Sequence, residues 1–92
     1  MKELRQLLAR YDLLSDKEIK AVDDNIGYIN IGLKQNPDLL EYDYFLTINI
    51  SIDASKILLE YYKIKYGCNF NIEVSFYSSR ERYGITFKKI EV

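Results

Sequence analysis

Few side chains in this sequence could carry out catalysis. The 92 residues include no histidine, so neither a Ser-His-Asp nor a Cys-His arrangement can form, and zinc sites of the usual Cys/His kind are excluded. Cys68 is the only cysteine, which excludes an intramolecular disulfide. The glycines, at positions 27, 32, 67 and 84, match neither a P-loop nor a dinucleotide-binding fingerprint. We therefore expect a protein that is not an enzyme and that needs no cofactor, and an enzyme that uses Asp, Glu, Lys or Tyr is the third hypothesis.

Candidate ligands for a hard cation are also few. The plausible ones are Asp23, Asp24, Asp43 and Asp53. Segment 23–27 lacks the alternating ligand positions of an EF-hand loop, and its composition is typical of a turn between two elements. We expect no metal site.

Tyrosine is the most unusual feature of the composition, with nine residues. A tyrosine adds a large amphipathic surface at low entropic cost and is enriched in binding hot spots. Two of the tyrosines share one face of a predicted helix, and two others alternate with carboxylates just before a predicted strand. The alternative is that several tyrosines line the core and keep only their hydroxyls in water. The predicted partner-binding site consists of Glu41, Tyr42, Asp43, Tyr44, Tyr62 and Tyr66.

A group of basic residues surrounds the last predicted turn. Tyr77 and Tyr83 flank this turn, and a mixture of basic and aromatic side chains is typical of proteins that grip single-stranded nucleic acids. The same charges would equally protect an edge strand from aggregation, and Glu81 and Glu91 interrupt them. Nucleic-acid binding is therefore the alternative hypothesis, and its residues are Arg80, Arg82, Tyr83, Lys88 and Lys89.

The charges are distributed unevenly along the chain. A net charge of −1 excludes the broad basic field of a general nucleic-acid binder. Residues 1–53 carry six basic and ten acidic side chains, whereas residues 54–92 carry seven basic and four acidic ones. This asymmetry is either an ordinary solvated surface or a charge dipole that orients a partner.

Apolar residues at helical spacing predict two main amphipathic helices. The first stripe is Leu4, Leu7, Leu8, Tyr11 and Leu14. The second, over residues 54–66, is Ile57, Leu58, Tyr61 and Ile64. Asp53 is expected to cap this second helix and Gly67 to end it in a left-handed conformation. Between the two, Ser15 and Glu18 form a capping-box pattern that predicts a short helix over residues 16–22, with a strand over 18–22 as the rival interpretation.

Apolar and polar residues that alternate with period two predict four strands. These strands cover residues 26–33, 46–52, 69–77 and 83–88, and Pro37 separates the first from the second. The clearest alternation is that of 46–52, where Leu46, Ile48, Ile50 and Ile52 point to one side. The polar side chains would then form an uncovered sheet face that shows Thr47, Asn49, Ser51, Asn71, Glu73, Ser75, Thr86 and Lys88.

Together these elements predict a single α+β domain over residues 1–92, in the order α-(short α)-β-β-α-β-β. We expect a four-stranded, mainly antiparallel sheet with the two main helices on one face. No apolar stretch approaches the ~20 residues that cross a bilayer, and we expect a cytoplasmic protein. The predicted function is a non-enzymatic module that binds another protein, such as a small inhibitor, adaptor or immunity-type protein encoded by a phage or mobile element. A homodimer formed through an edge strand or the uncovered sheet face is compatible with this hypothesis.

Overall fold

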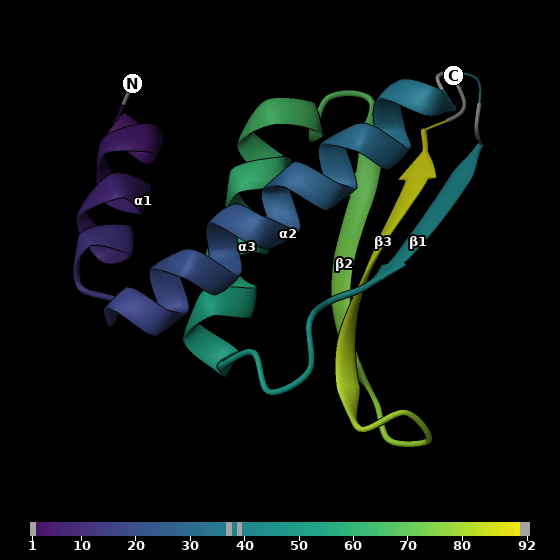
Figure 1. Cartoon of the computed structure of the whole chain (residues 1–92). Coiled ribbons are helices and arrows are strands. Elements are labelled where there is room, and N and C mark those ends of the chain that lie inside the picture. The colour runs from purple at the N-terminus through teal and green to yellow at the C-terminus, as the bar shows by residue number, and fades with distance from the viewer. Residues whose placement is uncertain (1, 37, 39, 91–92) are drawn as a thin grey trace.

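The computed structural model describes residues 2–36, 38 and 40–90, which form three helices and three strands (Figure 1). In chain order the elements are α1 (Lys2–Asp12), α2 (Asp16–Gln35), β1 (Glu41–Phe45), α3 (Ile52–Tyr66), β2 (Phe70–Tyr77) and β3 (Arg82–Lys89). The predicted α+β character is therefore confirmed, as are the two main helices and the last two strands. The break predicted at Pro37 lies outside the described residues.

The three strands form one antiparallel sheet with β3 in the centre, in the order β1-β3-β2. Thr86 of β3 lies opposite Asp43 of β1 on one side and opposite Glu73 of β2 on the other. Residues 78–81 join β2 to β3 in a tight turn, where Glu81 takes a left-handed conformation with a φ of 53°. The predicted four-stranded sheet is wrong, because two of the predicted strands adopt other structures.

Residues 26–33, predicted as a strand, belong to the long helix α2. This helix begins as predicted, since the Ser15 hydroxyl accepts a bond from the Glu18 backbone N–H at 3.2 Å and the Glu18 carboxylate accepts one from the Ser15 N–H at 3.1 Å. It then continues for 20 residues, because Val22, Asn25 and Ile29 fall at helical spacing and are buried in the core. Burial of this stripe outweighs the modest helix propensity of isoleucine. The rival strand over residues 18–22 is therefore also wrong.

Residues 46–51, predicted as the clearest strand, form an irregular connection between β1 and α3. Leu46 and Ile50 are buried, but Ile48 is 61% exposed, so the alternation does not describe one sheet face. Asn49 has a φ of 64°, which interrupts an extended chain. Ser51 then caps α3 by accepting a bond from the Ala54 N–H at 3.0 Å, in the role predicted for Asp53.

The helices lie on one side of the sheet (Figure 1). Helix α3 packs on β2, and α2 lies beside it, where the ring of Tyr42 from β1 fills the space in front of Gly32. Helix α1 packs against α3 and lies farther from the sheet, so the second helix on the sheet is α2 and not the predicted N-terminal one (Figure 1). The end of α3 also differs from the prediction, because Gly67 has a φ of −62° and is not left-handed.

Candidate functional site

No helix of the described chain covers the second face of the sheet (Figure 1). We call this surface the open face. The strand register and the alternation of side chains place on it Glu41, Asp43, Phe45, Asn71, Glu73, Ser75, Tyr77, Arg82, Gly84, Thr86 and Lys88. The connection 46–51 takes Thr47, Asn49 and Ser51 off this face, contrary to the prediction. The other predicted members are placed there correctly.

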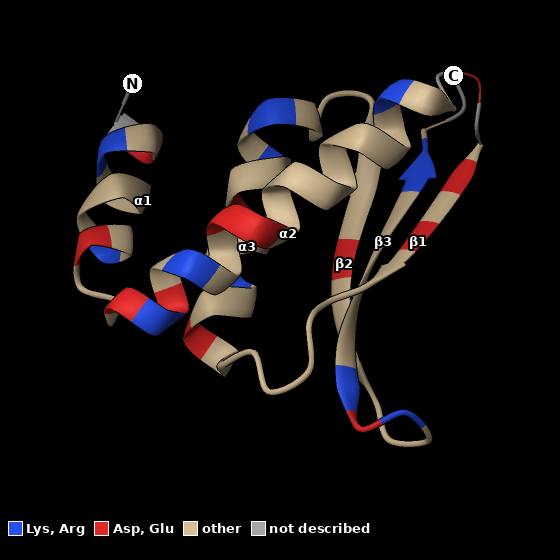
Figure 2. Cartoon of the chain, in the orientation of Figure 1, with Lys and Arg blue, Asp and Glu red and all other residues tan. Residues whose placement is uncertain are grey.

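The charges of the open face are separated along the strands (Figure 2). Asp43 and Glu73 flank Thr86 in one row, and Glu41 lies opposite Lys88 in the next. The far end of the sheet is mainly basic, because Arg82 begins β3 and Arg80 lies in the turn before it, with Glu81 between them. One end of the face is therefore mainly acidic and the other end basic.

Two aromatic rings and an arginine pack together at the basic end. The rings of Phe45 and Tyr77 meet edge to face, with centroids 5.3 Å apart, and the Arg80 guanidinium lies 4.9 Å from the Phe45 centroid. Gly84 lies beneath them, and a Cβ at this position would come within 2.5 Å of the Tyr77 ring. Glycine therefore allows the ring to rest on the backbone of the central strand. We call Phe45, Tyr77 and Arg80 the aromatic–arginine cluster.

A shallow pocket adjoins the aromatic–arginine cluster. Its volume is about 160 Å³, and it is lined by Asp43, Tyr44, Phe45, Tyr77, Gly84 and Ile85. Phe45 is 37% exposed, because no helix of the described structure covers this face of the sheet. The cluster thus offers apolar area, a cation and a small recess at one place on the surface.

The six residues of the predicted partner-binding site are not brought together. Glu41 and Asp43 lie on the open face, whereas Tyr42 and Tyr44 alternate with them and are half-buried on the helix side. Burial raises the pKa of both tyrosines, because it disfavours the phenolate. Tyr42 and Tyr66 line the same pocket, which has a volume of about 450 Å³ and also includes two lysines, from α2 and α3.

Tyr62 is a core residue, as the alternative interpretation of the tyrosines expected, and it offers no surface to a partner. The side chain has no exposed surface, and its single hydroxyl proton is shared between Asn30 Oδ1 at 2.8 Å and the more distant Ile26 carbonyl at 3.3 Å. Its ring also meets the buried ring of Phe87 edge to face, with centroids 5.2 Å apart. Burial raises the pKa of Tyr62 well above its ordinary value, with further contributions from neighbouring tyrosines.

The five residues of the alternative nucleic-acid site are also divided. Arg82 and Lys88 lie on the open face at opposite ends of β3, and Lys88 is opposite Glu41. Tyr83 lies on the helix side, where its ring packs against Phe76 with centroids 5.1 Å apart. Lys89 shares that side by alternation. Of the five, only Arg80 and Arg82 lie close together next to partly exposed aromatic rings.

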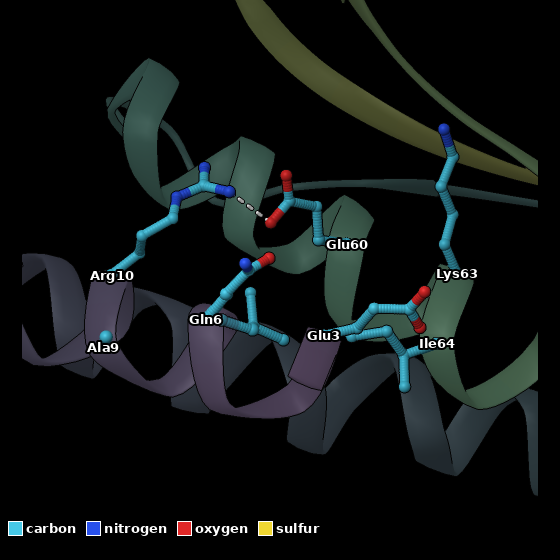
Figure 3. Close-up of a pocket in the computed structure, with 8 residues that line it drawn as sticks. Glu3, Gln6, Ala9, Arg10, Glu60, Lys63 and Ile64 are labelled. Carbon is cyan, nitrogen blue, oxygen red and sulfur yellow. Dashed lines mark hydrogen bonds and ion pairs between the residues drawn. The ribbon is translucent and has the colours of Figure 1, made fainter. Parts of the chain in front are cut away.

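A second hollow lies between α1 and α3 (Figure 3). It has a volume of about 610 Å³, and an ion pair between Arg10 and Glu60 crosses it. Glu3 and Lys63 stand at its other end (Figure 3). The hydrogen bond to Glu60 raises the pKa of Arg10 above its ordinary value. The ion pair links α1 to α3.

The described residues offer neither a metal-binding cluster nor a membrane-spanning helix. No group of three His, Cys, Asp or Glu side chains in this part of the chain could hold a metal ion. None of the described helices combines the length and the apolar character needed to span a membrane. Comparison with protein-family models, curated proteins and solved structures found no match to this chain.

Sequence reasoning placed Tyr77, Arg80 and Arg82 near one turn, but it missed Phe45 and Gly84. Phe45 was missed because the strand was predicted to begin after it. A signal for Gly84 was present, since a glycine inside a strand pattern often marks a close approach to the backbone. What approaches Gly84 is the Tyr77 ring, from the neighbouring strand.

Proposed function

We propose that this protein is a non-enzymatic protein-binding module that contacts its partner through the open face. The observation that supports this proposal is the aromatic–arginine cluster on an exposed sheet face. Aromatic residues and arginine are enriched at the centres of protein interfaces, where they account for much of the binding energy. The cluster is already ordered by its own contacts, so little entropy is lost when a partner covers it.

The charge separation of the open face defines the chemistry of the partner. A complementary surface places a carboxylate next to Arg80 and Arg82, and basic side chains over Glu41, Asp43 and Glu73. The opposed charges at the two ends also fix the direction in which the partner lies along the strands. Small inhibitors, adaptors and immunity-type proteins are the functional classes that fit such a module.

The size of the open face sets an expectation for affinity. The three strands, two of eight residues and one of five, cover at most roughly 14 Å by 26 Å at ordinary strand spacing. This is roughly half of the ~800 Å² that each partner contributes to a standard interface. The partner is therefore expected to extend over the turn at residues 78–81, where Arg80 lies, or to bind transiently.

Single-stranded nucleic acid is the second candidate partner. It is favoured by one observation, namely that Arg80 and Arg82 stand beside the partly exposed rings of Phe45 and Tyr77. The carboxylates of Asp43 and Glu73 share the same face and would repel phosphates. For this reason we place it second.

The test is affinity capture of the tagged protein from a lysate of its native host, with and without nuclease, followed by mass spectrometry. We expect the wild type to capture one partner protein in stoichiometric amount, both with and without nuclease. Phe45→Ala and Arg80→Glu should each reduce its capture by about tenfold or more, because each removes part of the anchor. Tyr28→Ala, which removes an exposed ring from α2, is the matched control and should capture as well as the wild type.

Two results would contradict the proposal. If both cluster variants capture the same protein as well as the wild type, the partner does not use the open face. If nuclease removes every partner and binding falls steeply with salt, the second candidate is correct. Circular dichroism of each variant verifies that the fold is kept.

A further inference from the structure

Strand β2 lies at an edge of the sheet, and its outward backbone groups can be identified. The Ile90 N–H donates to the Asn69 carbonyl at 2.9 Å, which sets the phase of the β2–β3 ladder. In an antiparallel pair, residues alternate between those that bond across the ladder and those that point away from it. Every second residue from Asn69 to Tyr77 therefore forms backbone hydrogen bonds with β3. The residues that direct their N–H and C=O groups away from the sheet are Phe70, Ile72, Val74 and Phe76.

This edge has few of the features that usually prevent strand addition. Strand β2 is eight residues long, pairs with β3 without a bulge, contains no proline and carries one charged side chain, Glu73. The opposite edge, β1, has five residues and two carboxylates, Glu41 and Asp43. Long edges with little charge accept a further strand, whereas short, charged edges resist it. Phe76 is also 57% exposed on β2, so the edge presents apolar surface as well as backbone groups.

A hollow of about 660 Å³ adjoins the β2 edge. Phe70 and Ile72 of β2 border it on the helix side, together with Lys63 and Ile64 of α3. Glu3 of α1 completes this wall, and the hollow continues through Glu3, Lys63 and Ile64 into the space between α1 and α3 (Figure 3). The helices therefore extend past the edge of the sheet. A strand placed beside β2 would lie against them.

We propose that β2 accepts an extended segment of a partner protein as a fourth strand. The segment would alternate apolar side chains, directed toward Ile64, Phe70 and Ile72, with polar ones on the opposite face. A lysine or arginine in the segment would pair with Glu73, which stands on that polar face. This surface is separate from the aromatic–arginine cluster, and the inference does not depend on the proposed function.

The hollow favours a single strand over a second copy of this chain. If β2 of a second copy paired antiparallel with β2, its own α3 would arrive on the same side of the combined sheet, because α3 packs on β2 and the two-fold axis is perpendicular to the sheet. On the helix side of the sheet, α1 and α3 of the first copy already border the hollow at that edge, so a second α3 would meet them there. An isolated extended segment brings no helix with it.

The experiment selects octapeptides from a random phage-displayed library against the full chain and measures each selected synthetic peptide by fluorescence anisotropy. Amide hydrogen exchange with and without the peptide is the decisive readout. Strand addition protects the amides of Ile72, Val74 and Phe76, whereas those of Glu73 and Ser75 are already bonded to β3. Selected peptides should alternate apolar and polar residues and carry a basic residue.

Proline at position 74 removes an outward N–H without removing a bond to β3. We expect Val74→Pro to weaken peptide binding by about tenfold or more. Asp43→Pro is the matched control, since its N–H points away from β3 at the other edge, and it should bind as the wild type does. If Val74→Pro does not fold, Glu73→Lys serves instead and should shift selection from basic to acidic residues. Arg80→Glu should leave peptide binding unchanged.

Three outcomes would overturn this inference. The first is a library that yields no binding peptide. The second is protection of the outward amides of β1, around Asp43, in place of those of β2. The third is a dimer, seen by sedimentation, whose formation protects Ile72, Val74 and Phe76, because a second copy would then be the occupant.

Discussion

The carboxylate of Glu18 accepts a hydrogen bond of 2.5 Å from the hydroxyl of Ser51 and so joins the first turns of α2 and α3. Its other oxygen accepts the backbone N–H and the hydroxyl of Ser15, at 3.1 and 3.0 Å. Ser51 in turn caps α3 through the Ala54 N–H. One side chain thus fixes the relative position of two helix N-termini, where a negative charge is also favoured by the helix dipole.

We predict that Glu18 makes the stability of the fold depend on acidity. Its hydrogen bonds with Ser51 and then Ser15 lower the pKa of Glu18 below its ordinary value of 4.5. A lowered pKa means that the folded state binds its proton less readily than the unfolded state. The contribution of the Glu18 carboxylate to the stability of the fold is therefore complete above pH 4.5, and it is lost as the pH falls through the pKa of Glu18 in the folded state. Glu18→Gln should lower the urea midpoint at pH 7, and the difference from the wild type should shrink below pH 4.5.

Glu73→Gln is the control for this prediction. It removes an exposed carboxylate on β2, remote from the helix N-termini, and should leave the urea midpoint close to that of the wild type. A difference between Glu18→Gln and the wild type that stays constant from pH 7 to pH 3 would show that the charge of Glu18 does not contribute.

Elements fixed by neighbouring residues could be predicted from the sequence, and those fixed by distant contacts could not. The capping box of Ser15 and Glu18 lies within one turn, and it was predicted correctly. The bond from Ser51 to Glu18 spans 33 residues, and no local pattern reveals it. Residues 46–51 alternate like a strand, yet contacts with α2 and the left-handed Asn49 hold them in an irregular path.

The same distinction applies to the candidate site. Arg80 and Tyr77 lie close in sequence, and their approach at the hairpin turn was foreseen. Phe45 joins them only because β1 pairs with β3 in a register that places Phe45 opposite Gly84. Strand order and register depend on the whole sheet. A prediction that lacked β1 could not bring these residues together.

Asn25 is the contact that fixes the connection between β1 and α3, and we predict that Asn25→Ala destabilises the fold. Its buried amide donates to the Ala21 carbonyl at 2.7 Å and to Thr47 Oγ1 at 3.1 Å, and it accepts the Thr47 N–H at 3.3 Å. Removing it leaves the Thr47 backbone without a partner, which costs about 1–3 kcal/mol. Urea denaturation measures this loss.

Asn36→Ala is the matched control for Asn25→Ala, because it also removes an amide that donates to a carbonyl one turn earlier in α2. Asn36 is exposed, so water can replace the bond, and the change in unfolding free energy should stay below about 0.5 kcal/mol. Equal losses in the two variants would show that the bonds to Thr47 do not contribute.

Gly27→Ala is predicted to stabilise the protein. Gly27 is exposed in the middle of α2, and nothing lies within 4 Å of the position that a Cβ would take. Alanine is favoured over glycine in a helix interior by about 1 kcal/mol, so the free energy of unfolding should rise by about that amount. Gly32→Ala is the contrast, since its Cβ would collide with the Tyr42 hydroxyl. A loss of stability in Gly27→Ala would contradict the helical conformation of residues 26–33.

Tyr62→Phe is predicted to destabilise the core without changing its shape. The phenylalanine ring keeps the contact with Phe87, but the bonds to Asn30 and Ile26 are lost. A buried hydrogen bond of this kind contributes about 1 kcal/mol, and the urea midpoint at pH 7 should fall accordingly. Tyr61→Phe, on the neighbouring half-buried ring, is the control and should have a smaller effect.

Comparison of the wild type with Tyr62→Phe also tests the ionisation of Tyr62. Because burial raises the pKa of Tyr62 above its ordinary value of 10.0, the folded state keeps the phenol proton more tightly than the unfolded state does. The stability that comes from this group is thus complete below pH 10 and declines as the pH rises toward the folded pKa. The advantage of the wild type over Tyr62→Phe should therefore shrink between pH 10 and pH 11 in urea titrations. An advantage that stays constant over this range would place the Tyr62 hydroxyl in water, contrary to the structure.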